Sequence, residues 1–246
     1  SSDWNILAAP PSWLTGHVLR RDCILAPIPA ADYAKHESDL VLLPDIGIGS
    51  QGEVGSVLLF GAVPIESMKT IALPSDSATS VALLKHLLAK RGHDMNYVST
   101  GPDYDSMMAM ADGALLIGDR ALDAAREFPE MVQMDLGTAW MEEEGLPMIF
   151  GVFAARRDTP TALVQRAHAA LLANLVQFET DQTKRQRVIE WSMEKSGLTH
   201  ERLDQYYGEV FNRLNAHHLN GLFRFLEQAC GMENEPQFAW LADAVV

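Results

Sequence analysis

Up to residue 158, apolar residues fall into short runs separated by turn residues, and most runs precede a segment of helical periodicity. Short apolar runs bounded by turns predict buried strands, and apolar positions three and four apart predict helices. Strands are predicted at 4–8, 23–27, 41–49, 56–60, 70–73, 96–99, 113–117, 132–135 and 148–154. Helices are predicted at 13–20, 30–36, 64–68, 80–91, 104–110 and 120–126, then at 161–177, 181–195, 199–214 and 216–230.

Strands that alternate with helices, followed by a helical tail, indicate an α/β protein with a helical C-terminal cover. The alternation suits two lobes, with both chain ends in one lobe and the middle segment in the other. We expect lobe 1 to comprise 1–68 and 149–246, and lobe 2 to comprise 69–148. A ligand would then lie in the cleft between the lobes, at the carboxyl ends of strands.

Two turns rich in serine carry the candidate chemistry. Gly55 and Ser56 precede the apolar run 57–60, and Ser77, Thr79 and Ser80 lie between a strand and a helix. The first-turn amides of a helix have no partners within the helix, and the helix dipole places partial positive charge there. Two such turns predict a small ligand with more than one acidic group.

The composition changes this picture in two ways. A net charge of −14 argues against nucleic acid or an anionic membrane surface as a partner, because both need a basic face. The same charge repels a dianion until salt screens it beyond about 8–10 Å. Backbone N–H groups and hydroxyls must therefore supply the affinity for an acidic ligand.

The sequence shows no membrane helix, because no segment approaches the roughly 18 apolar residues that one needs. Residues 1–13 lack the basic segment and apolar core of a secretion signal, so we expect a cytoplasmic protein. Cys23 and Cys230 lie far apart and form no metal-ligand spacing. The adjacent His217 and His218 point to different sides of a helix, so we expect no metal site.

Four segments together resemble the chorismate dehydratase family of the futalosine route to menaquinone. They are LLPDIGIG with the following GEVGSVLLF, then SVALLKHLLA, then ALLIGDRAL, then DLGTAW with GLPMIFGVFAARRD. The resemblance extends from about residue 11 to 158 and continues weakly through the tail. It implies a two-lobed type II periplasmic-binding-protein-like fold. It also implies that a cytoplasmic enzyme removes water from chorismate to give 3-[(1-carboxyvinyl)oxy]benzoate, without metal or organic cofactor.

The resemblance also implies roles for particular residues. Ser56 matches a serine expected to be catalytic or to contact the substrate, and Thr79 and Ser80 match a segment that holds a carboxylate. Gly118 and Asp119 match a turn that faces the cleft from the second lobe. We therefore expect Ser56 to be catalytic. The expected substrate-binding residues are Gly55, Ser77, Thr79, Ser80, Gly118 and Asp119.

The chain also departs from the family pattern. Glu53 stands where the family has proline and Ala78 where it has arginine, and both changes should weaken the binding of a dianion. A strand and an asparagine-bearing loop that begin the family pattern have no counterpart here. Either the sequence is incomplete at its N-terminus or the protein lacks that side chain.

Several alternatives remain open at this stage. A non-catalytic protein that binds small carboxylates on the same fold is the second hypothesis. A third is a neighbouring futalosine-pathway enzyme that acts on a related aromatic acid. The proton acceptor is either a protein group or the substrate's own carboxylate. The apolar tail helices pack within the chain or form the face of a homodimer.

Overall fold

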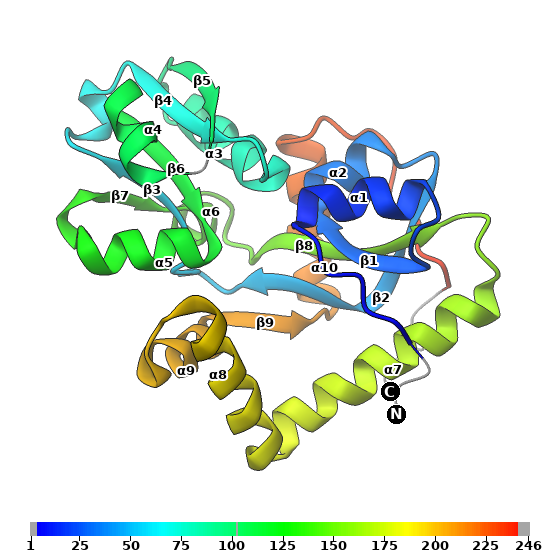
Figure 1. Cartoon of the computed structure of the whole chain (residues 1–246). Coiled ribbons are helices and arrows are strands. Elements are labelled where there is room, and N and C mark those ends of the chain that lie inside the picture. The colour runs from blue at the N-terminus through cyan, green and yellow to red at the C-terminus, as the bar shows by residue number, and fades with distance from the viewer. Residues whose placement is uncertain (1–3, 102, 241–246) are drawn as a thin grey trace.

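The computed structural model describes residues 4–101 and 103–240 and contains two β-sheets that lie side by side (Figure 1). The first sheet has four strands, and each neighbouring pair is antiparallel. In spatial order they are β1 (Leu25–Pro29), β8 (Met148–Arg156), β2 (Leu40–Ser50) and β9 (Val210–Arg213). We call this sheet and the helices packed on it, α1 (Pro11–Leu19), α2 (Ala30–Lys35) and α10 (Ala216–Gln228), the first lobe.

The second sheet is mixed and has five strands. In spatial order they are β5 (Asn96–Thr100), β4 (Thr70–Pro74), β6 (Gly113–Ile117), β3 (Val57–Gly61) and β7 (Val132–Asp135). β5, β4 and β6 run parallel, whereas β3 runs antiparallel to both of its neighbours. This sheet forms the second lobe with α3 (Ala78–Lys90), α4 (Tyr104–Met110), α5 (Gly118–Glu127) and α6 (Leu136–Glu144). Short 3-10 turns at Ile65–Ser67 and Pro129–Met131 complete it.

Three chain segments leave the first sheet side by side at Ser50. Ser50, the last residue of β2, pairs with Met148 at the start of β8 and with Val210 at the start of β9. The segments beyond these residues lead to β3, to α6 and to the tail helix α9 (His200–Glu209). The chain therefore passes between the two lobes through one narrow region.

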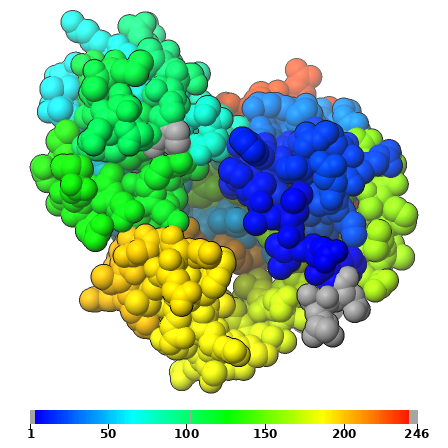
Figure 2. Space-filling view, viewed as in Figure 1, coloured from blue at the N-terminus to red at the C-terminus, as the bar shows by residue number. Residues whose placement is uncertain are grey.

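The tail helices cross from the first lobe to the second and back. α7 (Thr161–Thr180) leads to α8 (Gln182–Ser196) and α9, and the chain then returns to the first sheet as β9. Leu122 of α5 is buried in one cluster with Ile189 of α8 and with Leu198 and Leu203. Figures 1 and 2 show α8 and α9 beside α5. The α8–α9 pair thus covers part of the second lobe while rooted in the first.

One strand prediction and one helix prediction are wrong. Residues 4–8 form no strand, and Ile6 is 91% exposed. The helix predicted at 199–214 ends at Glu209, and Val210–Arg213 pair with β2 instead. Helix α6 at Leu136–Glu144 was not predicted.

The lobe boundary expected at residue 68 differs from the sheet arrangement. β3, at 57–61, pairs with β6 and β7 and so belongs to the second sheet. The chain therefore crosses between the sheets at 51–56, and it crosses back at 145–147, just before β8. The ends of the expected lobe 1, 1–3 and 241–246, lie outside the described residues.

The packing of α9 on α5 leads to a stability prediction. Leu203 is 4% exposed in the four-residue cluster, so Leu203→Ala should lower the free energy of unfolding by about 2–4 kcal/mol. Val188 on α8 is 37% exposed, and Val188→Ala should change it by less than about 0.5 kcal/mol. Urea unfolding of both variants measures the difference. Equal effects would show that α9 does not depend on this contact.

Candidate functional site

Three turns meet at one edge of the second sheet. Val57 of β3 pairs with Ile117 of β6, so the turn before β3 lies beside the turn after β6. β4 runs parallel to β6 with Ala72 opposite Ala114, and this register brings the turn after β4 level with residue 118. Carboxyl ends of parallel strands are where open α/β sheets bind ligands. The structure thus brings the sequence-predicted turns to a common edge.

Ser56 is the central hydroxyl of this edge. Ser56 is 4% exposed, and its backbone carbonyl accepts a hydrogen bond of 2.7 Å from the N–H of Gly118. This bond links two of the predicted site residues directly.

Asp135 holds the backbone that precedes Ser56. Its carboxylate accepts hydrogen bonds from the N–H of Val54 at 3.2 Å and of Gly55 at 2.8 Å. The same carboxylate accepts from the N–H of Thr138 at 2.9 Å and so caps the start of α6. One side chain therefore fixes the crossing segment to a helix end. The sequence analysis missed Asp135, although aspartate is a favoured residue directly before a helix, where its carboxylate accepts from backbone N–H groups.

The second hydroxyl-rich turn is buried as well. Ser77, Thr79 and Ser80 are 7%, 2% and 3% exposed. The Thr79 hydroxyl oxygen accepts a hydrogen bond of 3.1 Å from the N–H of Ala31, in the first turn of α2. The N-terminal turn of α3 in the second lobe thus meets that of α2 in the first. Thr79 therefore joins the lobes.

Gly118 and Asp119 lie on the open side of the edge. Gly118 has a φ of +61°, and an added Cβ would meet no atom within 4 Å, so open space adjoins it. Asp119 is exposed. The next residue, Arg120, donates to Asp76 Oδ2 at 2.5 Å, across the two turns. The other oxygen, Asp76 Oδ1, is buried and has no hydrogen-bond partner among the described residues.

Helix α9 supplies a further wall that the sequence analysis did not foresee. Arg202 donates to Glu209 through both terminal nitrogens, at 3.2 and 3.0 Å, and Glu209 is only 10% exposed. A Cβ built on Gly55 would lie 2.5 Å from Arg202 Nη2 and 2.5 Å from Glu209 Oε2. The ion pair is therefore seated directly on the Gly55 backbone, next to Ser56.

Tyr206 lies on the same face of α9. Burial raises the pKa of its phenol above the usual value, and a hydrogen bond with the Ser56 side chain acts in the opposite direction. The carboxylates of Asp119 and Glu209 add to the increase in the pKa of Tyr206. The phenol thus keeps its proton near neutral pH.

The burial of these hydroxyls distinguishes the site from the rest of the molecule. Eight polar or charged residues are classed as buried in the part of the chain that the structure describes, and four of them are predicted site residues. Buried hydroxyls are costly unless they have partners, which makes such a group unusual away from a binding site. Figure 2 shows a hollow between the green second lobe, the blue N-terminal segment and the yellow α8–α9 pair.

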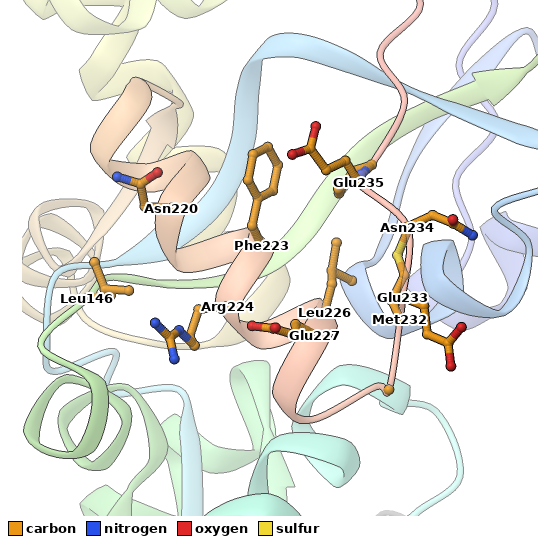
Figure 3. A pocket seen from close by; sticks show the side chains of 12 residues that line it. Leu146, Asn220, Phe223, Arg224, Leu226, Glu227, Met232, Glu233, Asn234 and Glu235 are labelled. Atoms are coloured by element: carbon orange, nitrogen blue, oxygen red, sulfur yellow. The ribbon is translucent and has the colours of Figure 1, made fainter.

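A second hollow lies elsewhere, between α10 and the segment 231–236, with a volume of about 880 Å³ (Figure 3). It contains none of the predicted site residues and no hydroxyl side chain. Its lining carries the carboxylates of Glu227, Glu233 and Glu235 but only one cation, Arg224. An acidic ligand would be repelled there, so we place the candidate site at the sheet edge.

Two absences hold for residues 4–101 and 103–240. No three histidine, cysteine, aspartate or glutamate side chains are grouped so that they could hold a metal ion. No helix in this part of the chain is both long and apolar enough to span a bilayer.

Comparison with known proteins agrees with this geometry. The family model described as menaquinone biosynthesis matches residues 1–230. A chorismate dehydratase from Thermus thermophilus is 35% identical over 190 residues, which are 68% of this chain and 68% of that protein.

The fold is also found in solved structures. A protein from Archaeoglobus fulgidus has a TM-score of 0.69 at 18% identity, over 91% of this chain and 84% of its own. The periplasmic aliphatic sulphonate binding protein of Escherichia coli has a TM-score of 0.63 at 14% identity, over 93% and 82%. The predicted periplasmic-binding-protein-like fold is confirmed.

A pair of glycines provides a test of the contact between α9 and the site. Gly55 and Gly118 have φ values of +65° and +61°, so alanine costs about 1–2 kcal/mol of backbone strain at either position. Only at position 55 would the new methyl group also collide with Arg202 and Glu209. Gly55→Ala should therefore lower the free energy of unfolding in urea by more than Gly118→Ala. Equal losses would mean that the ion pair does not rest on Gly55.

Thr79 provides a second test. Thr79→Val keeps the shape of the side chain but leaves the buried Ala31 N–H without its acceptor, at a cost of about 1–3 kcal/mol. Thr79→Ser retains the acceptor and should cost less. Urea unfolding measures both variants, and a valine variant as stable as the serine variant would contradict the bond between the lobes.

Proposed function

The chain belongs to the menaquinone biosynthesis family, and we propose on this basis that it is a chorismate dehydratase. Its reaction removes water from chorismate and gives 3-[(1-carboxyvinyl)oxy]benzoate. The observation that carries the proposal is the group of buried hydroxyls at the sheet edge, in a chain similar to the Thermus enzyme. Chorismate has two carboxylates, and the site offers hydroxyls and backbone N–H groups rather than a surface of free cations.

The chemistry needs little beyond positioning. The ring hydroxyl leaves with its bonding electrons, and the neighbouring ring carbon that carries the enolpyruvyl ether loses a proton, so the ring becomes aromatic and one water is released. The elimination transfers no electrons to or from another molecule, so it requires no redox cofactor. We propose a hydro-lyase that works without metal or organic cofactor. Its task is to orient the leaving group, supply one proton acceptor and exclude bulk water.

Ser56 is the proposed catalytic residue. Its position at the meeting of β3, the Gly118 turn and α9 supports a role beside the reacting ring. A hydroxyl can donate to the departing oxygen and can accept from another donor at the same time. Ser77 and Ser80, with the hydroxyl of Thr79, are proposed to bind one carboxylate at the N-terminus of α3.

The remaining proposed contacts come from the Gly55 and Gly118–Asp119 turns. Open space beside Gly118 supports this placement of the ligand. The net charge of −14 makes nearby cations important, and Arg120 lies at this edge although position 78 is alanine. Its partner Asp76 has one unpaired oxygen, which suits a hydrogen bond from a ligand hydroxyl. We also propose a cytoplasmic location, in keeping with a soluble biosynthetic substrate.

The proposal predicts that the protein turns over chorismate and that Ser56→Ala slows this turnover. Purified protein incubated with chorismate should form the benzoate product, followed by absorbance and by mass. Ser56→Ala should lower kcat by at least about tenfold, which corresponds to roughly 1.4 kcal/mol of transition-state stabilisation. Ser192→Ala removes a half-buried hydroxyl of α8 and should leave kcat unchanged.

Two results would count against the proposal. Chorismate binding without any product would favour a non-catalytic carboxylate-binding protein on the same fold. Unchanged turnover in folded Ser56→Ala would remove Ser56 from the mechanism.

A further inference from the structure

We propose that Tyr206 is a positioning residue that holds the Ser56 hydroxyl toward the bound substrate. The proposal rests on the function proposed above, because it concerns the same reaction. It adds α9, a helix of the C-terminal cover, to a site whose sequence-predicted residues all lie between positions 55 and 119.

The geometry of α9 carries the first step. Arg202, Tyr206 and Glu209 are spaced by four and three residues, so they share one face of the helix. Arg202 and Glu209 occupy the space that a side chain at position 55 would need. The face that bears Tyr206 is thereby fixed against the residue that precedes Ser56.

Tyr206 itself is held in place by its neighbours. The Arg202 guanidinium lies 6.0 Å from the centre of its ring, and Tyr207 packs at 5.8 Å between ring centres. Leu203, one turn earlier, is buried against α5. A side chain held on several sides loses little further entropy when it bonds to a ligand-facing group. The phenol can therefore restrict the rotation of the Ser56 hydroxyl at small cost.

Two hydrogen-bonding properties make this useful. A neutral phenol has one proton to donate and lone pairs to accept, so it can satisfy either side of the serine hydroxyl. When Tyr206 occupies one hydrogen-bonding position of the Ser56 hydroxyl, the other position points to the substrate. Such preorganised dipoles lower the barrier because they need no reorientation during the reaction.

Tyr207 offers a matched control on the same helix. Its hydroxyl lies 2.8 Å from the Ser192 hydroxyl and its ring packs on Phe178, so it bonds within the tail rather than to Ser56. Tyr206→Phe and Tyr207→Phe therefore remove the same atom from adjacent residues with different partners.

The test is a double-mutant cycle on chorismate turnover. Tyr206→Phe should lower kcat about five- to tenfold with less than a twofold change in KM. In the Ser56→Ala background it should change kcat by less than about twofold, because the group that it positions is gone. Tyr207→Phe should leave kcat unchanged in both backgrounds. The same loss of kcat from Tyr206→Phe with and without Ser56 would overturn the proposal.

A second readout separates this proposal from the dehydratase assignment. The three single variants and the two double variants are unfolded in urea, where Ser56→Ala and Tyr206→Phe should be non-additive, whereas Ser56→Ala and Tyr207→Phe should add. If the wild-type protein does not turn over chorismate but the Ser56→Ala and Tyr206→Phe effects on unfolding are non-additive, the enzyme assignment is overturned and the Tyr206–Ser56 contact is supported. Additive unfolding together with additive loss of turnover would overturn the contact and leave the dehydratase standing.

Discussion

The carboxylate of Asp135 is the constraint on which the site depends. It accepts hydrogen bonds from Val54 and Gly55 in the segment that crosses between the lobes, and from Thr138 at the start of α6. A carboxylate with several backbone donors makes strong, directional bonds. These bonds hold the segment that leads into β3 and the start of α6 as one unit. Ser56 is the next residue along the chain after Gly55.

From this unit the other contacts follow in order. Fixing Ser56 fixes its carbonyl, which accepts from Gly118 and so brings the turn after β6 to the same place. The Gly55 backbone then offers a flat surface without a side chain, and the Arg202–Glu209 pair of α9 rests on it. Each of the two glycines has a positive φ, which L-residues with a side chain adopt only with strain. The site is therefore built from backbone positions as much as from side chains.

The sequence allowed much of this to be predicted where the information is local. The two hydroxyl-rich turns were found because helix periodicity begins directly after Ser77–Ser80, and because small residues precede the run 57–60. The fold class followed from strand–helix alternation and from family resemblance. Local patterns could not show which sheet β3 joins, since an apolar strand fits either one.

Most of the missed features depend on partners far away in the chain. Val210–Arg213 continues a helical pattern, and only pairing with β2 turns it into a strand. Residues 4–8 have a strand pattern but form no strand, and Ile6 is exposed. Tyr206 and Arg202 lie in a polar tail helix whose sequence does not point to Gly55 or Ser56. Asp135 was the exception, because its helix-capping position is visible locally.

The meeting of three segments at Ser50 also has a consequence for how the chain folds during synthesis. The second sheet draws all its strands from residues 57–135, so its pairings become available as soon as that stretch has been made. The first sheet must wait, because β2 pairs on one side with β8 and on the other with β9, both far downstream. Pairings between distant segments form slowly, since a long loop must close first. β1 and β2 thus stay unpaired until β8 has been made, the β2–β9 edge forms only after residue 213, and α9 reaches Ser56 only at that late stage.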